Sequence, residues 1–157
     1  MHTRRHALTA SARLALLLLG AGVLPAAAQA QAQAAGFNQA AFDAKSLADV
    51  MKALGANAPT ASGDVAVSAP DIAENGAVVP VGASSALPGV KRLMVLVEKN
   101  PSALSAIFDV SDMVDANFST RVKMGQSSDV YAVAMMNDGR VLYAKKEVKV
   151  TLGGCGG

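Results

Sequence analysis

From Asp64 to the end of the chain, apolar residues recur at every second position in short segments, and turn residues separate these segments. A period of two places successive side chains on opposite faces of an extended strand, so each segment predicts a strand with one face in a core. The predicted strands are residues 65–67, 78–81, 90–97, 104–110, 118–124, 130–136 and 141–152. About seven short strands with regularly spaced turns favour an all-β fold, an immunoglobulin-like β-sandwich.

Two turn sequences support this division. Asn137-Asp138-Gly139 predicts a hairpin between the last two strands. Glu74-Asn75-Gly76 predicts a turn before the second strand, where we expect Gly76 to supply a positive φ. This second turn needs no function beyond that conformation.

One short helix is predicted before the strands. Ser46-Leu47-Ala48-Asp49 matches the capping box that begins many helices, and Gly55 is typical of a helix end. Four apolar residues fall on one face of this helix, namely Ala44, Leu47, Met51 and Leu54. Residues 56–63 contain Pro59 and small polar side chains, which indicate a linker.

The first 30 residues have the features of an export signal. Arg4 and Arg5 form a twin arginine, residues 14–24 are a short apolar run, and residues 26–30 offer A-x-A cleavage sites. This pattern predicts a twin-arginine (Tat) signal and a periplasmic mature protein. The apolar run is much shorter than the roughly 20 residues of a spanning helix, so we expect no membrane span.

The charge of the chain changes once this signal is set aside. The whole sequence has a formal net charge of +2, but residues 1–35 contain Arg4, Arg5, Arg13 and no acidic residue, which leaves −1 for the rest. No stripe of basic residues interleaved with aromatic ones remains. We therefore expect no nucleic-acid partner.

Catalytic and metal sites are also disfavoured by composition. His2 and His6 are the only histidines, and both belong to the signal. Without histidine, neither a Cys–His dyad nor a Ser–His–Asp triad can form, and a zinc site lacks its usual ligands. The carboxylates of a polar connection favour a solvated loop rather than an acid/base pair; they are Asp109, Asp112 and Asp115. We expect no cofactor and no metal.

Other residues that could suggest function fit structural roles. Methionine at strand spacing is usually core filler rather than a copper ligand; these residues are Met94, Met124, Met135 and Met136. Tyr131 and Tyr143 are predicted to be half-buried in the sandwich. The charged residues of the last strand are predicted to form its solvated face; they are Lys145, Lys146, Glu147 and Lys149.

The chain has one cysteine, Cys155, placed between two glycine pairs at the C-terminus. The pairs are Gly153 and Gly154 before it and Gly156 and Gly157 after it. No neighbouring side chain can bury the sulfur, so we expect an exposed thiol on a flexible arm. No second cysteine exists for an internal disulfide, so the thiol must be used between molecules. Five extended residues span at most about 17 Å, enough to enter a narrow active-site channel. The segment therefore predicts a carrier arm.

Two alternatives remain open at this point. A chain that ends in Gly-Gly could be a ubiquitin-like carrier activated at its terminal carboxyl, which predicts that blocking the carboxyl ends function. A structural or adhesion module could instead use Cys155 only for an intermolecular disulfide, which predicts a covalent dimer without a sulfur adduct.

Several segments resemble the SoxY family, the sulfur-carrying subunits of the Sox thiosulfate-oxidation system. They are residues 69–76 with 79–81, 97–101, 120–124 and 148–157. The resemblance extends from Ser46 to the last residue and includes the twin-arginine signal. Within it, Cys155 occupies the carrier position of a specific C-terminal GGCGG motif.

The resemblance implies an immunoglobulin-like sandwich that works as a heterodimer with SoxZ, which such a protein would carry through the Tat pathway. It further implies that SoxXA couples thiosulfate to Cys155, that SoxB releases sulfate, and that SoxCD or transfer to a sulfur globule removes the remaining sulfur. The protein itself would catalyse none of these steps. We thus expect a signal in residues 1–30, a leader, helix and linker in 31–63, the sandwich in 64–152 and the carrier arm in 153–157.

Overall fold

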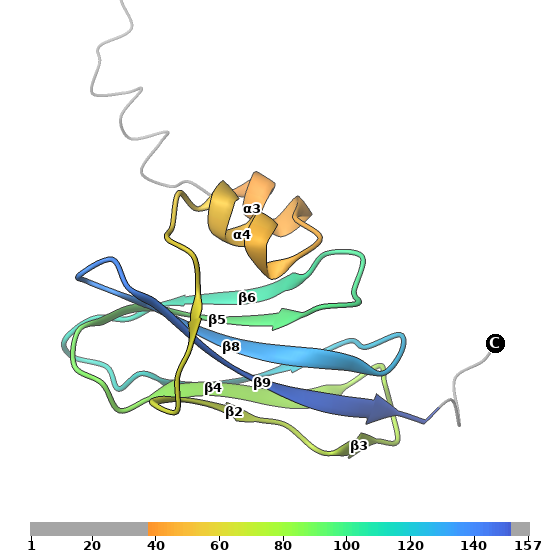
Figure 1. Cartoon of the computed structure of the whole chain (residues 1–157). Coiled ribbons are helices and arrows are strands. Elements are labelled where there is room, and N and C mark those ends of the chain that lie inside the picture. Colours follow the sequence, from red (N-terminus) through yellow and green to blue (C-terminus); the bar gives the residue numbers. More distant parts are fainter. Residues whose placement is uncertain (1–37, 152–157) are drawn as a thin grey trace, which may run out of the picture. The chain divides into compact units, whose positions relative to one another are not determined.

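The structure, a computed structural model, describes residues 38–151 (Figure 1). Within this range lie two short helices, α3 (Gln39–Asp43) and α4 (Leu47–Ala53), and nine strands. The strands are β1 (Thr60–Ala61), β2 (Val65–Ser68), β3 (Ile72–Ala73), β4 (Val79–Ser85), β5 (Val90–Val97), β6 (Leu104–Asp109), β7 (Asn117–Val122), β8 (Ser128–Met136) and β9 (Val141–Val150). The seven predicted strands are confirmed as β2 and β4 to β9, with ends shifted by a few residues.

The strands form two sheets, which confirms the all-β sandwich (Figure 1). The larger sheet has the order β1-β9-β8-β5-β6, and β3 pairs with β9 beside this path. The smaller sheet has the order β2-β4-β7. The longer strands pair antiparallel, whereas the two-residue strands β1 and β3 both run parallel to β9.

The main core lies between the two sheets. Alternate residues of β4, β5 and β8 point into it, including Val81, Val95 and Ala132, all at most 3% exposed. Phe108 of β6 and Phe118 of β7 stack across the two sheets, with ring centroids 4.7 Å apart and planes within 2°. The period of two in the sequence is thus the period with which side chains enter this core.

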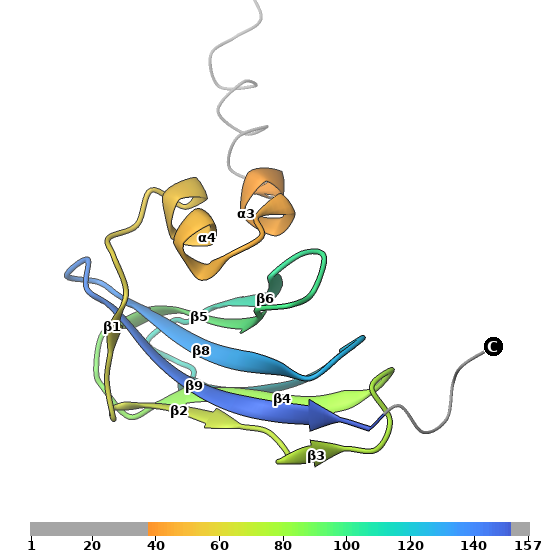
Figure 2. The same ribbon diagram turned by 45° about the vertical axis from the view of Figure 1, so that its right-hand side comes forward.

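A second core covers the outer face of the larger sheet, where α3 and α4 lie over β5, β6 and β8 (Figures 1 and 2). Val50 and Met51 of α4 pack there against Met94 and Leu96 of β5. Residues 93–97 are therefore buried without interruption, because one side of β5 faces the smaller sheet and the other side faces the helices. Met94, Met124 and Met136 are core residues, as predicted, and Met135 is half-buried.

The predicted helix is confirmed as α4. The Ser46 hydroxyl accepts the backbone N–H of Asp49 at 3.1 Å and donates to the Asp49 carboxylate at 2.7 Å. Such a cap contributes about 1 kcal/mol because it satisfies a donor that the first helical turn leaves unpaired. Gly55 follows the helix with a φ of 64°, in the left-handed region that favours glycine.

Three short elements were not predicted from the sequence. α3 has five residues, begins at the side-chain cap of Asn38 and buries Ala41 completely. β1 lies inside the segment predicted as a linker, and β3 lies between the first two predicted strands. Each is too short to show a period of its own, and both strands form only because β9 is beside them.

No helix within residues 38–151 is long and apolar enough to cross a bilayer. The predicted signal in residues 1–30, the end of the last strand at Leu152, and the cysteine segment 153–157 all lie outside the described residues.

Candidate functional site

The end of the sandwich from which the cysteine segment departs is built from several loops. β4 begins there and β7 ends there, since Val79 pairs with Val122, while β8 begins opposite the end of β9, since Ser128 pairs with Val148. We define the Thr151 end as residues 71–78, 98–103, 123–127 and 149–151. Figure 2 shows β3 beside the last residues of β9 at this end.

One edge of β9 is hydrogen-bonded to β3 and the residue before it. The backbone N–H of Lys149 donates to the Asp71 carbonyl at 3.0 Å, and that of Thr151 donates to the Ala73 carbonyl at 3.1 Å. The Thr151 hydroxyl donates to the same Ala73 oxygen at 3.4 Å. Bonds at alternate residues are the pattern of a parallel ladder, so β9 stays in a sheet up to its last described residue.

Lys146 also holds this segment, which corrects the prediction that it belongs to the solvated face of β9. Lys145, Glu147 and Lys149 are exposed, but Lys146 lies on the opposite face and is half-buried. Its ammonium donates to the Ala69 carbonyl at 2.6 Å and pairs with the Asp71 carboxylate at 2.9 Å. The prediction failed because the alternation of β9 continues through Lys146, which reaches past the core to residues 69–71, between β2 and β3.

The other edge of β9 contacts the loop between β7 and β8. β9 pairs with β8 only as far as Val148. Two residues later, the backbone N–H of Val150 donates to the hydroxyl of Ser127 at 2.9 Å. Ser127 therefore takes the place of a strand partner and satisfies a donor that would otherwise lack one within the protein.

Gly76 packs against β9 and the loop between β7 and β8, and the reason for a glycine at this position differs from the predicted one. The positive-φ glycines among the described residues are Gly55, Gly89 and Gly139, so the prediction of a positive φ at Gly76 was wrong. A Cβ at Gly76 would lie 2.3 Å from the Met124 carbonyl oxygen and 2.9 Å from Cγ1 of Val150. Glycine is needed here because two backbones approach closely, as the hydrogen bond from Met124 N–H to the Gly76 carbonyl at 2.7 Å also indicates.

The predicted site residue Cys155 and the predicted arm residues lie just beyond this anchored strand end, outside the described residues; the latter are Gly153, Gly154, Gly156 and Gly157. Cys155 follows Thr151 by four residues. Whatever their conformation, four residues span at most about 14 Å. The Thr151 end therefore bounds the positions that the thiol can reach.

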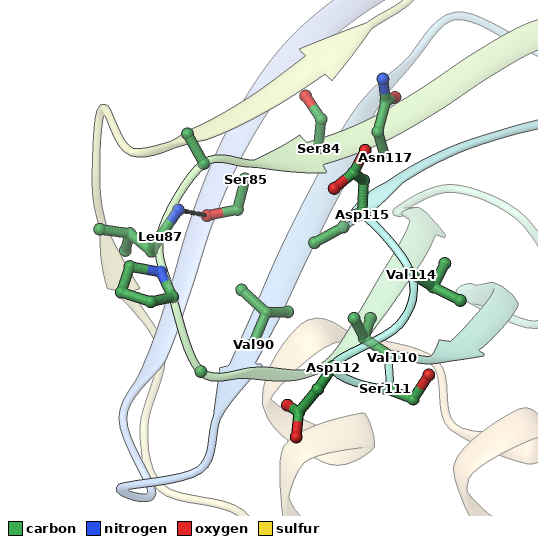
Figure 3. A pocket seen from close by; sticks show the side chains of 14 residues that line it. Ser84, Ser85, Leu87, Val90, Val110, Ser111, Asp112, Val114, Asp115 and Asn117 are labelled. Carbon is green, nitrogen blue, oxygen red and sulfur yellow. Dashed lines mark hydrogen bonds between the residues drawn. The ribbon is translucent and has the colours of Figure 1, made fainter.

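The predicted carboxylates lie at the opposite end of the sandwich and are exposed; Asp112 and Asp115 belong to a loop, as predicted, whereas Asp109 is the last residue of β6. Asp109 forms an ion pair with Arg92 at 2.6 Å. Asp112 and Asp115 line an open hollow of about 580 Å³ between the β4–β5 and β6–β7 loops (Figure 3). Within residues 38–151, no group of three or more His, Cys, Asp or Glu side chains is arranged to hold a metal ion.

Tyr131 and Tyr143 are half-buried, as predicted, with ring centroids 5.8 Å apart. Burial raises the pKa of Tyr131 from its ordinary value, and the nearby Glu98 acts in the same direction. A hydrogen bond to the carboxylate of Asp129 raises the pKa of Lys145, whose ammonium lies 2.6 Å from that carboxylate. The raised pKa values favour the neutral form of the Tyr131 phenol and the charged form of the Lys145 ammonium. Neither group therefore becomes a proton donor or acceptor near neutral pH.

A family match and a solved structure both indicate one family. Residues 50–155 match the family described as sulfur oxidation protein SoxY, and this match includes Cys155. No curated protein matches the sequence. The solved structure of the sulfur carrier protein SoxY from Chlorobium limicola f thiosulfatophilum is 31% identical over 66% of this chain and 93% of that chain, with a TM-score of 0.59.

A more distant likeness concerns the fold alone. The superoxide reductase (neelaredoxin) from Ignicoccus hospitalis is 17% identical over 55% of this chain and 80% of that chain, with a TM-score of 0.50. The family match spans all nine strands and continues to Cys155, and the SoxY structure is similar over almost its whole length. The chain therefore belongs to the SoxY family of sulfur-oxidation proteins.

Proposed function

We propose that this protein is a periplasmic carrier that holds thiosulfate-derived sulfur covalently on Cys155 and presents it to the other enzymes of thiosulfate oxidation. The observation that carries the proposal is the position of the only cysteine. It follows a strand end that is hydrogen-bonded on both edges, and a family match to a sulfur-oxidation protein extends through it. The solved relative from Chlorobium is a sulfur carrier.

The chemistry begins with an oxidative coupling. The Cys155 thiolate and the thiosulfate dianion form a sulfur–sulfur bond and give a cysteine S-thiosulfonate, with two electrons passing to a c-type cytochrome enzyme, SoxXA. Hydrolysis by SoxB then adds water to the terminal sulfonate and releases sulfate and two protons, which leaves one sulfur atom on the cysteine. SoxCD, or transfer to a sulfur globule, removes that atom. Every redox and hydrolytic step belongs to a partner, and the carrier supplies the sulfur attachment point.

Export and assembly complete the proposal. Residues 1–30 carry a twin arginine, a short apolar run and A-x-A sites, so the Tat pathway exports the chain. Because that pathway transports folded cargo, the protein can carry SoxZ with it as a heterodimer. In the periplasm, the glycines on either side of Cys155 present the sulfur with the least possible width.

Intact and peptide mass spectrometry of the protein taken from periplasm, with and without thiosulfate, tests this function. We expect a mass increment of a thiosulfate or sulfane type, confined to the peptide that contains Cys155 and dependent on thiosulfate. An unmodified thiol, or only a symmetric disulfide, under both conditions would favour the structural or adhesion module.

A further inference from the structure

Four large apolar side chains are exposed among the described residues, and they form two pairs. Ile72 and Val78 are 57% and 51% exposed at the Thr151 end, whereas Met113 and Val114 are 92% and 49% exposed in the loop between β6 and β7 at the opposite end. Single exposed apolar residues are common on protein surfaces and need no partner. Their meaning therefore depends on what must approach each end of the sandwich.

The length of chain beyond Thr151 decides which end a partner must approach. Cys155 can lie at most about 14 Å from Thr151. An enzyme that takes the cysteine into a narrow active-site channel must bring the rim of that channel close to Thr151. The surface around Thr151 is then covered each time the sulfur is handed over.

Ile72 and Val78 flank the point of departure. Ile72 pairs with Lys149 in the parallel ladder, and the next residue, Ala73, accepts the hydrogen bond from Thr151. Val78 lies two residues after Gly76, whose backbone packs against Val150 and Met124. These hydrogen bonds fix β9 relative to Ile72, and the close approach of Gly76 to Val150 brings the turn that carries Val78 to the same end of the sandwich.

Charge alone does not single out a partner at this end. Asp71, Glu74 and Glu98 are exposed there together with Lys99, Lys123 and Lys149. A mixture of both signs gives no single-sign field that would steer a charged partner. The exposed apolar side chains are therefore the features able to add affinity to an encounter directed at Thr151.

We infer that the Thr151 end is the surface on which the enzymes that receive Cys155 dock, and that Ile72 and Val78 make its apolar contacts. The occupant is the rim of an active-site channel that accepts a cysteine-bound sulfonate or sulfane group. This inference rests on the proposed function and names the surface that serves it. Since docking contacts act equally before and during the reaction, their loss raises KM and leaves kcat unchanged.

The test measures the loading of Cys155 by its oxidising enzyme, using the complete heterodimer, thiosulfate and a cytochrome electron acceptor. Adduct formation is followed by intact mass at limiting enzyme, for the wild type, Ile72→Asp, Val78→Asp and the double variant. The matched controls are Met113→Asp and Val114→Asp, which place the same charge on the exposed apolar pair at the opposite end. Ile72→Thr retains a β-branched side chain in β3 and replaces Ile72→Asp if that variant does not fold.

We expect kcat/KM to fall by about tenfold in the double variant through KM, with both controls at the wild-type value and little change with ionic strength. Three results would overturn the inference: wild-type kinetics in the double variant, an equal loss of kcat/KM in the controls, or a steep dependence of kcat/KM on salt. In each case, an adduct on Cys155 of the wild type would still support the carrier function. Loss of the heterodimer in Ile72→Asp or Val78→Asp would assign the patch to the permanent partner and overturn it as well. Absence of any adduct on the wild type would refute both.

Discussion

The backbone N–H of Thr151 donates to the carbonyl of Ala73 over 3.1 Å, which joins the end of β9 to a residue 78 positions earlier in the chain. Together with the bond from Lys149 to Asp71, it keeps the chain in a parallel ladder until four residues before the cysteine. The reach of Cys155 is counted from the point where this ladder ends. Residues of β3 and its neighbours thus fix the point from which the chain continues toward Cys155.

Ser127→Ala should loosen the end of β9 while the rest of the sandwich keeps its stability. The substitution removes the acceptor of the Val150 N–H, a hydrogen bond of 2.9 Å, and a bond of this kind contributes about 0.5–1.5 kcal/mol. We expect the amide of Val150 to exchange with solvent about two- to tenfold faster. Ser111→Ala, an exposed serine in the loop at the opposite end, is the control and should leave this exchange unchanged. Equal protection of Val150 in both variants would mean that Ser127 does not hold the strand.

Gly76→Ala should destabilise the whole domain. Its new Cβ would meet the Met124 carbonyl at 2.3 Å and the side chain of Val150 at 2.9 Å, and the backbone atom cannot move aside without shifting its own strand end. Overpacking of this kind costs about 1–3 kcal/mol of the free energy of unfolding. Urea denaturation monitors the change.

The neighbouring Gly125→Ala is the matched control for that experiment. Nothing lies within 4 Å of its Cβ, and its φ is not positive. It should be neutral or stabilise the protein by less than about 1 kcal/mol, because alanine restricts the unfolded chain. A similar loss of stability in both variants would contradict the close approach at Gly76.

The parts of the fold that sequence predicted are those encoded by local patterns. Seven strands were visible because each is long enough to show alternation, and α4 was visible because Ser46, Asp49 and Gly55 mark its two ends. β1 and β3 have two residues each and exist through pairing with β9, far away in sequence. The sequence also did not predict that the helices cover the outer face of the larger sheet. The uninterrupted apolar residues 93–97 are consistent with such a cover, because both faces of β5 are then buried.

The candidate site was likewise predictable only in the parts that a local pattern marks. Cys155 stood out because the chain has no other cysteine and four glycines surround it. The anchoring of β9 did not stand out, because it depends on backbone donors and on the Ser127 hydroxyl, which no spacing rule singles out. Gly76 looked like a turn glycine beside Asn75, and only the packing of Met124 and Val150 gives its actual reason.

Replacing both Gly153 and Gly154 with valine should slow the transfer of sulfur without changing the fold. Valine is β-branched, so it widens the segment and restricts its backbone, which under the proposed function enters a channel. We expect a lower rate of adduct formation on Cys155 at an unchanged melting temperature. Gly63→Val is the control, since nothing lies within 4 Å of a Cβ at Gly63. Unchanged rates in the double variant would mean that glycine serves another purpose in this segment.

Cys155→Ser should separate folding from function completely. The substitution replaces only the sulfur of a residue outside residues 38–151, the range within which the two cores are described. We therefore expect an unchanged melting temperature and an unchanged heterodimer by size-exclusion chromatography, together with loss of every thiosulfate-dependent mass increment. A serine hydroxyl cannot form the sulfur–sulfur bond on which the proposed carrier function depends, whereas it fills nearly the same space. Loss of the heterodimer in this variant would contradict a cysteine segment that contacts only the enzymes it serves, and residual thiosulfate loading would place the attachment point elsewhere in the protein.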